Sequence, residues 1–418
     1  MQVAEIISGV IGPDVPVRII GYDGSKAGPD SAEAALRIAS PRALARLVTA
    51  PGTLGLARAY VTGEIEVEGE LYGILAAMPD VILHDIPRAQ RVQLARQLVP
   101  VWLRHRMPPP EFEYRPPGRL HSKARDRKAI SHHYDVSNRF YEWVLGPSMA
   151  YTCAVFPTEQ ATLEEAQAQK HELVARKLAL EPGMRLLDVG CGWGGMVMHT
   201  AAEHGVKALG VTLSGNQAAW AQAEITRRGL DGLAEVRHVD YRDAPEAEFD
   251  AISSIGLTEH VGRTQLPSYF ASLHERLRPG GRLLNHCITE ARTPSGRLDP
   301  FINRYIFPDG ELHSVGHVVS TMNDAGFEIR HEENLREHYA RTLAGWGANL
   351  EAHWDEAVAD VGIGRARVWR LYMAACRLGF ERDNIQLHQV LGERVHGDGR
   401  SGFPLRGWQV FLPDNRPR

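Results

Sequence analysis

The sequence predicts an α/β protein in which a mostly parallel sheet is covered by helices, joined to a smaller α+β domain. From about residue 180 onward, apolar strand-like runs alternate with amphipathic helical segments. Alternating units of this kind build parallel sheets with both faces buried. The chain has 418 residues, of which 44% are hydrophobic. This size and composition allow a large core spread over two or three domains.

The alternation predicts the elements of the larger part in order. Strands are expected at 185–190, 207–214, 234–240, 249–256 and 282–289. Helices are expected at 196–205, 216–229 and 268–281, the last of them ending at a glycine pair. Further helices and a final strand at 406–413 complete the chain.

Composition divides the chain into three segments. Residues 1–105 mix short strands and helices, including a helix after Ser40, whose side chain is a suitable N-cap. Residues 106–130 form a basic, proline-rich linker, because 107–118 contain five prolines. Residues 131–418 form the larger α/β domain.

Charge and cysteine content exclude several classes of protein. The net charge of −4 gives no overall polycation for nucleic acid. The four cysteines show no C-x-x-C pairing, so neither a metal site nor a disulfide framework is expected. The N-terminus lacks the basic start of a signal peptide, and no apolar stretch reaches the length of a membrane span. We therefore expect a cytoplasmic protein.

The stretch LLDVGCGWGG, residues 186–195, is the first candidate site. Gly190, Gly192 and Gly194 allow the backbone to approach a ligand closely, and the following helix offers free N–H groups. In parallel sheets, ligands bind at the carboxyl ends of the strands. The alternative is a tight β-to-α turn without a ligand.

The residues around the turn indicate which ligand it binds. The stretch lacks the Gly-Lys-Ser/Thr of a P-loop. Asp188 ends the strand, where a carboxylate can fix a cationic amine, and 212–217 offer polar groups for a ribose. The pattern resembles the first motif of class I S-adenosylmethionine-dependent methyltransferases, which implies a Rossmann-like seven-stranded sheet with helical insertions. Asp240 and Tyr241 would then border the adenine.

Six further motifs indicate which family of methyltransferases the chain resembles. They occupy 130–156, 162–170, 254–262, 285–289, 303–312 and 338–346. Together they closely resemble the cyclopropane-fatty-acid synthase family, which includes the mycolic acid methyltransferases, over about residues 125–400. Within that family the chain looks most like the actinobacterial branch that makes precursors of tuberculostearic (10-methylstearic) acid. Residues 1–105 resemble, more weakly, the lipid-handling domain of the full-length synthases.

The resemblance implies two sets of site residues. The family holds a bicarbonate ion as a base, and its ligands match Cys153, Glu259, His286, the backbone of Ile288, and Tyr339. The cofactor contacts match Tyr151, Thr152, Gly190, Thr212, Leu213 and Gln217, with Tyr241 at the adenine. Taken alone, Cys153 and His286 are also consistent with ordinary core residues, and Glu259 with a helix N-terminal acid.

These residue types fit methyl transfer to an alkene. The alkene is a weak nucleophile, so alignment and desolvation must do most of the work. The carbocation formed needs nearby negative charge and aromatic faces, which Glu259, Tyr151 and Tyr339 would supply. A proton must then leave to a base, which His286 and Tyr339 would orient.

Two departures from the family pattern bear on the product. Thr258 stands where relatives carry an aromatic residue before the glutamate, and Glu142 is an acid where relatives mostly have none. A Glu142 that points inward would replace or supplement bicarbonate as the base, whereas the plain alternative is a solvated helix carboxylate. We expect a 10-methylene acyl product, which a separate reductase would saturate; the alternative product is a cyclopropane ring.

The lipid substrate implies contact with a membrane. Residues 86–106 carry Arg88, Arg91, Arg96, Arg104 and Arg106 among apolar side chains, and 115–128 add a second basic cluster. Such clusters favour binding to an anionic phospholipid surface, although an ordinary solvated face would look alike. The resemblance also implies a homodimer. Two other functions stay open, namely methylation of a small soluble acceptor and lipid binding without catalysis.

Overall fold

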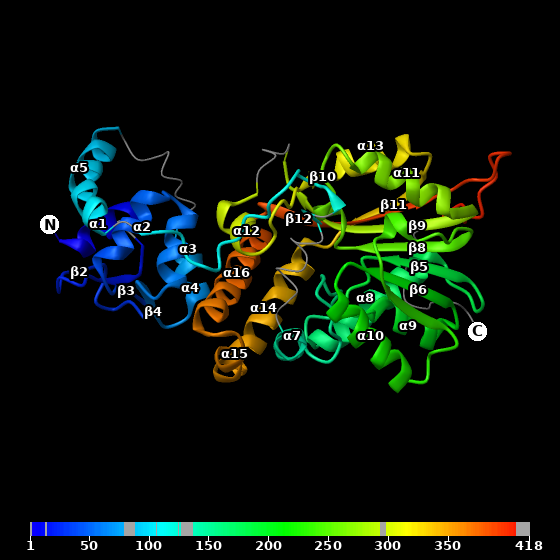
Figure 1. The fold of residues 1–418 in the computed structure, drawn as a ribbon, viewed down its shortest axis with the longest axis horizontal. Coiled ribbons are helices and arrows are strands. Elements are labelled where there is room, and N and C mark those ends of the chain that lie inside the picture. Colours follow the sequence, from blue (N-terminus) through cyan, green and yellow to red (C-terminus); the bar gives the residue numbers. More distant parts are fainter. Residues whose placement is uncertain are drawn as a thin grey trace. The chain divides into compact units, whose positions relative to one another are not determined.

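The computed structural model describes residues 2–12, 15–78, 88–105, 107–123, 125–126, 137–292 and 298–406. Contacts divide the chain into two compact units (Figure 1). The first contains Met1–Arg115, Asp299–Pro308 and Leu350–Leu378, and the second contains Pro116–Leu298, Asp309–Asn349 and Gly379–Arg418. Segments 299–308 and 350–378 thus group with the N-terminal residues, although the sequence divides the chain only near residues 105 and 130.

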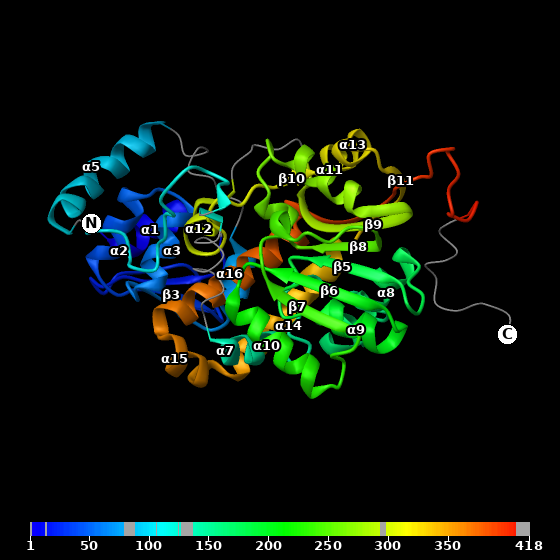
Figure 2. The same cartoon turned by 45° about the vertical axis from the view of Figure 1, so that its right-hand side comes forward.

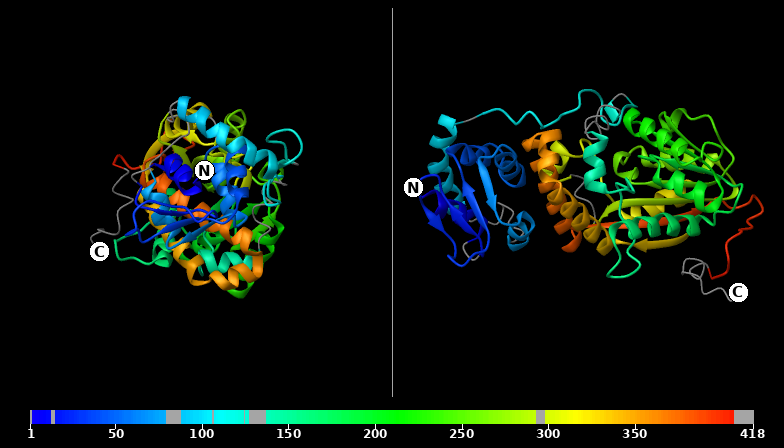
Figure 3. Two further views of the ribbon diagram at one scale, coloured as in Figure 1. Left: turned by 90° about the vertical axis from the view of Figure 1, so that its left-hand side faces the viewer. Right: turned by 90° about the horizontal axis from the view of Figure 1, so that it is seen from below.

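The first unit is built on a four-stranded sheet in the order β2-β1-β3-β4, whose strands are coloured blue in Figure 3. Its strands are β1 (Arg18–Ile20), β2 (Lys26–Ala27), β3 (Ala35–Ile38) and β4 (Ile65–Glu68). Its helices are α1 (Val3–Ile11), α2 (Pro41–Thr49), α3 (Thr53–Val61), α4 (Leu71–Ala77), α5 (Arg88–His105), α12 (Pro300–Tyr305) and α15 (Trp354–Val361), with most of α16 (Ile363–Glu381). The predicted cap is confirmed, since Ser40 accepts a hydrogen bond from the Arg42 N–H.

The second unit contains the predicted sheet, in the order β11-β12-β9-β8-β5-β6-β7 among the described residues (Figures 1 and 2). Its strands are β5 (Arg185–Val189), β6 (Lys207–Thr212), β7 (Ala234–His238), β8 (Phe249–Ile255), β9 (Leu277–Glu290), β11 (Glu328–Asn334) and β12 (Ile385–Glu393). Neighbouring strands from β7 to β9 are parallel, whereas β12 runs antiparallel between β9 and β11. The two-residue β10 (His313–Ser314) pairs with the end of β9.

Helices cover both faces of this sheet, as the alternation predicts. On one face lie α8 (Leu163–Leu178), α9 (Gly195–His204) and α10 (Gly215–Arg227), and on the other α11 (Leu266–Arg276) and α13 (Val315–Asp324) (Figure 2). Leu186 packs into the first core and Leu187 into the second. This alternation is the two-residue period of a strand buried on both sides.

One expected helix is shorter than predicted, and one expected strand lies almost wholly outside the described residues. The predicted helix over 268–281 ends earlier, at Arg276, because the following Arg-Pro-Gly-Gly belongs to the start of the long strand β9. The final strand expected at 406–413 lies, apart from Arg406, outside the described residues. Among the described helices, none is long and apolar enough to span a bilayer.

Candidate active site

The glycine-rich turn joins β5 to α9 in a conformation that depends on glycine. Gly190, Gly192 and Gly194 have φ angles of 77°, 55° and 77°, in the left-handed region that disfavours side chains. A Cβ on Gly190 would lie 3.3 Å from Leu257. The N–H groups of Gly190 and Cys191 both donate to the Val211 carbonyl at the end of β6, at 2.9 and 3.0 Å. The turn is therefore fixed against the neighbouring strand.

A cavity opens where the turn meets the carboxyl ends of β6, β7 and β8. Six predicted cofactor residues line it, namely Gly190, Gly192, Thr212, Leu213, Gln217 and Tyr241. At the end of β6 the Thr212 hydroxyl donates to Gln217 Oε1 at 2.8 Å, which sets the orientation of the Gln217 amide. The cavity lies where open α/β sheets bind ligands, and its bare glycine backbone fits close approach by a cofactor.

The other predicted cofactor residues do not line this cavity. Gly194 is the N-cap of α9, and a Cβ there would lie 3.3 Å from Ala221 and Val236, so its role is packing. Asp188 lies buried in β5 and accepts a hydrogen bond from the Ser253 hydroxyl at 2.6 Å. Burial raises the pKa of Asp188 to about 6. This carboxylate supports the turn from within the sheet instead of facing the cavity.

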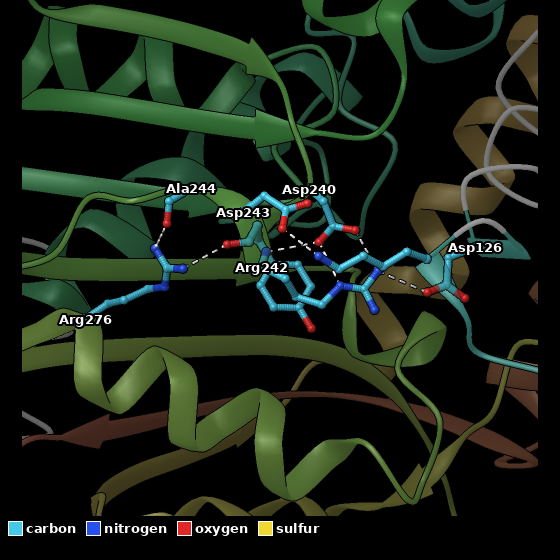
Figure 4. Close-up of polar contacts among 8 residues, drawn as sticks. Asp126, Asp240, Arg242, Asp243, Ala244 and Arg276 are labelled. Atoms are coloured by element: carbon cyan, nitrogen blue, oxygen red, sulfur yellow. Dashed lines mark hydrogen bonds and ion pairs between the residues drawn. The ribbon is translucent and has the colours of Figure 1, made fainter.

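Arg242 is a cavity residue that the sequence does not single out (Figure 4). Its guanidinium donates to both carboxylate oxygens of Asp240, at 2.8 and 2.6 Å, and to Asp126 at 3.2 Å. Burial alone would raise the pKa of Asp240, but the hydrogen bonds from Arg242 lower it overall. Asp240 is thus engaged by Arg242, while the neighbouring Tyr241 lines the cavity as expected. No local motif marks this pairing.

Glu259 forms a second, buried part of the site. It lies in the short 3-10 helix η3 (Thr258–His260). Leu257 and His260, on either side of it in the sequence, line the cavity. Its Oε1 accepts a hydrogen bond from the Ile288 N–H of β9 at 2.7 Å. Its Oε2 is buried and makes no hydrogen bond with any described residue. Burial raises the pKa of Glu259 to about 7.

His286 lies two residues before Ile288 on β9, fully buried. Its Nδ1 is 3.1 Å from the side-chain nitrogen of Gln389, whose oxygen accepts from the Lys177 ammonium at 2.7 Å. The lysine fixes the orientation of the amide, so the amide N–H donates to Nδ1 and the proton of the imidazole resides on Nε2. Burial, aided by Lys170 and Lys177, holds the pKa of His286 well below its usual value. His286 Nε2 is buried and makes no hydrogen bond with any described residue.

Cys153 and Thr152 border a buried cation that sequence reasoning missed. Lys170 on α8 donates to the Thr152 hydroxyl at 3.1 Å, and burial lowers the pKa of Lys170 to about 8. The charge of Lys170 lowers the pKa of both Cys153 and His286. Burial raises the pKa of the Cys153 thiol strongly. Cys153 is therefore a neutral thiol and not a nucleophile.

Aromatic rings gather around Tyr151 and Tyr339. The Tyr151 ring lies 5.3 Å from Trp346, and the Tyr339 ring lies 6.1 Å from Trp346 and 4.5 Å from Phe380. Tyr339 and Trp346 both belong to α14 (Arg336–Ala352). Clustered ring faces of this kind stabilise nearby positive charge.

Glu142 does not join the site. It lies on α7 (Asn138–Leu145), is exposed, and accepts a hydrogen bond from the indole N–H of Trp220 at 3.2 Å. Of the two alternatives for this acid, the structure agrees with the solvated helix carboxylate, because the amphipathic α7 buries Phe140, Tyr141, Val144 and Leu145 instead. Thr258, the other departure, is buried, and its hydroxyl donates to Asn285 Oδ1 at 2.6 Å.

Known proteins are similar to this chain in sequence and in fold. The family model described as mycolic acid cyclopropane synthetase matches residues 121–390. The chain is 51% identical over 406 residues to the probable fatty acid methyltransferase Rv3720 of Mycobacterium tuberculosis, and the match covers 94% of each protein. It is 33% identical over 368 residues to the cyclopropane-fatty-acyl-phospholipid synthase of Escherichia coli, covering 87% of this chain and 89% of that one.

Two further matches bear on the product and the fold. The tuberculostearic acid methyltransferase UfaA1 of M. tuberculosis is 31% identical over 389 residues, covering 90% of this chain and 87% of that one. The solved structure of the mycolic acid cyclopropane synthase CmaA1 with SAH and CTAB aligns with a TM-score of 0.60 at 33% identity, covering 64% of this chain and 98% of that chain. The chain therefore belongs to the mycolic acid cyclopropane synthetase family, whose members are class I S-adenosylmethionine-dependent methyltransferases acting on fatty acids.

Proposed function

We propose that this methyltransferase acts on the cis double bond of an unsaturated, oleoyl-like phospholipid acyl chain. The observation that carries the proposal is the pair of buried atoms Glu259 Oε2 and His286 Nε2, which have no partner among the described residues. Buried polar atoms are costly unless they are hydrogen-bonded. One atom belongs to β9 and the other to η3, which is hydrogen-bonded to β9 through Ile288 and Glu259, and such atoms favour a bound polar group.

A small oxyanion such as bicarbonate fits this pair. The imidazole Nε2–H of His286 donates, and a protonated Glu259 donates as well, since the pKa of Glu259 is raised to about 7. The Lys170 ammonium adds positive charge near His286. Bicarbonate, when bound, supplies a base for the proton that leaves after methyl transfer. In the family pattern the Ile288 backbone also contacts this ion, whereas here the Ile288 N–H donates to Glu259.

The remaining residues align the reactants and protect the cation. Gly190, Gly192, Thr212 and Gln217 would bind S-adenosylmethionine at the strand ends, with Tyr241 beside the adenine. The rings of Tyr151 and Tyr339 would face the positive charge that develops on the acyl chain. Burial of Glu259 and His286 excludes water, which would otherwise capture that cation.

We further propose a 10-methylene product in the biosynthesis of 10-methyl-branched fatty acids, which a separate reductase would saturate. The support is the polar Thr258–Asn285 hydrogen bond at a position where relatives carry an aromatic ring. Without that ring the cation is held less firmly, so a hydride shift competes better with ring closure. A cyclopropane product is the second candidate, favoured by the exposure of Glu142, which leaves the Glu259–His286 pair without a competing base.

One assay separates these products. The purified protein is incubated with S-adenosylmethionine and vesicles of oleoyl phospholipid, and the released acyl chains are examined by mass spectrometry and proton NMR. A gain of one CH₂ with vinylidene protons supports the methylene product. The same mass with upfield cyclopropyl protons supports ring formation, and an unchanged mass contradicts the lipid substrate.

Helix α5 offers a surface for membrane docking. Arg96, Val99 and Leu103 are exposed at the three- and four-residue spacing of one helix face, with Val99 at 41% and Leu103 at 59% exposure, and Arg104 is exposed next to Leu103. Exposed apolar groups flanked by arginine suit an anionic phospholipid surface. The side chains of Arg88 and Arg91, and residues Arg106, Arg127 and Lys128, lie outside the described part of the chain. In the linker, Arg125 pairs with Asp309 and Lys123 with Asp243, which weakens that part of the basic surface.

Charge reversal on α5 tests this docking surface. The double variant R96E/R104E should reduce sedimentation with anionic vesicles at least tenfold, since each basic residue near such a surface contributes about 1 kcal/mol. R227E/R228E, on the exposed end of α10, is the matched control and should leave sedimentation unchanged. Equal binding by R96E/R104E and the unmodified protein would contradict the proposal. A homodimer is also expected, and the mass of the protein in solution tests it.

A further inference from the structure

We propose that α8 and α9 together form a binding site for a divalent transition metal of the zinc class. Its three ligands are Glu172 on α8 and His199 and His204 on α9. The cysteine pattern gives no indication of such a site, because these ligands come from two helices that only the fold brings together. The site is separate from the cavity and from the Glu259–His286 pair.

The ligand atoms converge as a metal requires. Glu172 Oε2 lies 3.5 Å from His199 Nε2 and 2.9 Å from His204 Nε2. All three ligand atoms lie within 4.8 Å of one another. Zinc bonds of about 2.0–2.2 Å in a tetrahedral site place neighbouring ligand atoms roughly 3.3–3.5 Å apart. Small movements of the side chains would therefore complete the geometry.

Atoms of the ligands are available for an ion. His199 Nε2 is buried, makes no hydrogen bond with any described residue, and lies 3.5 Å from Glu172 Oε2. The other carboxylate oxygen, Oε1 of Glu172, accepts from Arg176 at 2.9 Å. An outer hydrogen bond of this kind orients a ligating carboxylate.

The surroundings indicate what the metal would do. The side chains of Glu172, His199 and His204 are 31%, 18% and 19% exposed, so an ion can reach them from solvent. Three protein ligands leave a fourth position for water. Helix α9 starts directly after the glycine-rich turn, and a Cβ on its first residue, Gly195, would lie 3.1 Å from His171 of α8. A metal at this position would hold α8 against the helix that carries the cofactor turn.

Metal content and spectroscopy test the proposal. Untagged full-length protein is stripped with chelator, then titrated with Zn²⁺ or with Co²⁺ as a visible-light probe. We expect one equivalent bound per chain, a Co²⁺ absorption typical of tetrahedral coordination, and a rise in Tm on metal addition. In H204Q and E172Q the affinity should fall at least 100-fold, and the metal-dependent rise in Tm should disappear.

Controls distinguish a lost ligand from a damaged fold. The metal-free Tm of H204Q and E172Q should match that of the metal-free unmodified protein. H353Q removes a histidine from the exposed His353–Glu356 pair, which lies at 3.7 Å, and it should leave metal binding unchanged. Equal binding by H204Q, E172Q and the unmodified protein, or less than one fifth of an equivalent bound to the latter, would overturn the proposal.

Discussion

The cofactor cavity and the two buried residues Glu259 and His286 are built in different ways. The cavity is shaped by backbone, through glycines with positive φ and strand ends that converge on it. The pair is shaped by side chains whose protonation depends on burial and on partners far away in the sequence. Cofactor affinity should therefore depend on the shape of the cavity, and turnover on the charge and protonation of Glu259 and His286.

The largest loss of turnover should come from replacing the titratable carboxyl group of Glu259. E259Q keeps the shape and the acceptor for the Ile288 N–H but loses the ionisable oxygen. We expect turnover on oleoyl phospholipid to fall by about 10³-fold, because an electrostatic group aimed at developing charge is worth roughly that much. Cofactor affinity, measured by calorimetry, should stay within about threefold. A comparable loss of cofactor affinity would show that the two regions are not separate.

The same variant should be more stable than the unmodified protein at alkaline pH. The pKa of Glu259 is raised from 4.5 to about 7 by burial, so the protonated form stabilises the fold. That stabilisation is complete below pH 4.5 and is lost as the pH rises through 7. At pH 8 the free energy of unfolding of E259Q should exceed that of the parent by up to about 3 kcal/mol, and at pH 4 it should not. Parallel pH profiles of denaturant unfolding would contradict the assignment.

A smaller loss of turnover should follow when the tautomer of His286 is no longer fixed by a hydrogen bond. Q389A removes the amide that lies between Lys177 and His286. We expect a 10- to 100-fold loss of kcat, about that of a misplaced acid–base group, with KM for the cofactor unchanged. Q389E should invert the required tautomer and lose at least as much activity. Q386A, on the same strand, removes a surface hydrogen bond to Asp383 and serves as the control.

Cofactor affinity should fall when a side chain is added to a glycine of the cavity. G190A places a Cβ 3.3 Å from Leu257 at a φ of 77°, whereas G192A places one in open space at 55°. Both carry the cost of the left-handed region, about 1 kcal/mol, but only G190A also meets a neighbour. Cofactor affinity should therefore fall roughly tenfold more in G190A than in G192A. Calorimetric titration measures this, and equal losses would mean that strain alone matters.

The smallest effect is expected at Glu142. Because this carboxylate is exposed and bonded to Trp220, E142Q should change turnover by less than about twofold, as surface substitutions usually do. A loss approaching that of E259Q would restore Glu142 as a base.

The sequence predicted the cavity better than it predicted the pair. The alternation of strands and helices, the glycine spacing and the polar residues after β6 are local patterns, and six of the predicted cofactor residues do line the cavity. Lys170, Lys177, Gln389 and Arg242 left no local signal, because their roles arise from contacts across α8, β12 and the end of β7. The position of Glu142 stayed open at the sequence level, since a single acid in an amphipathic segment does not reveal which face of the helix it occupies.

Glu259 is held from two sides, and this has an evolutionary consequence. Its carboxylate is bound by Ile288 of β9, while its main-chain carbonyl accepts a hydrogen bond from the N–H of Glu311 at 2.9 Å. The stretch just before β10 therefore sets the position of the acid without contributing a side chain to the chemistry. Insertions or deletions in that stretch would move Glu259 while every predicted site residue is retained. Divergence of products within such a family can proceed through loop length alone, a route that comparison of active-site residues would overlook.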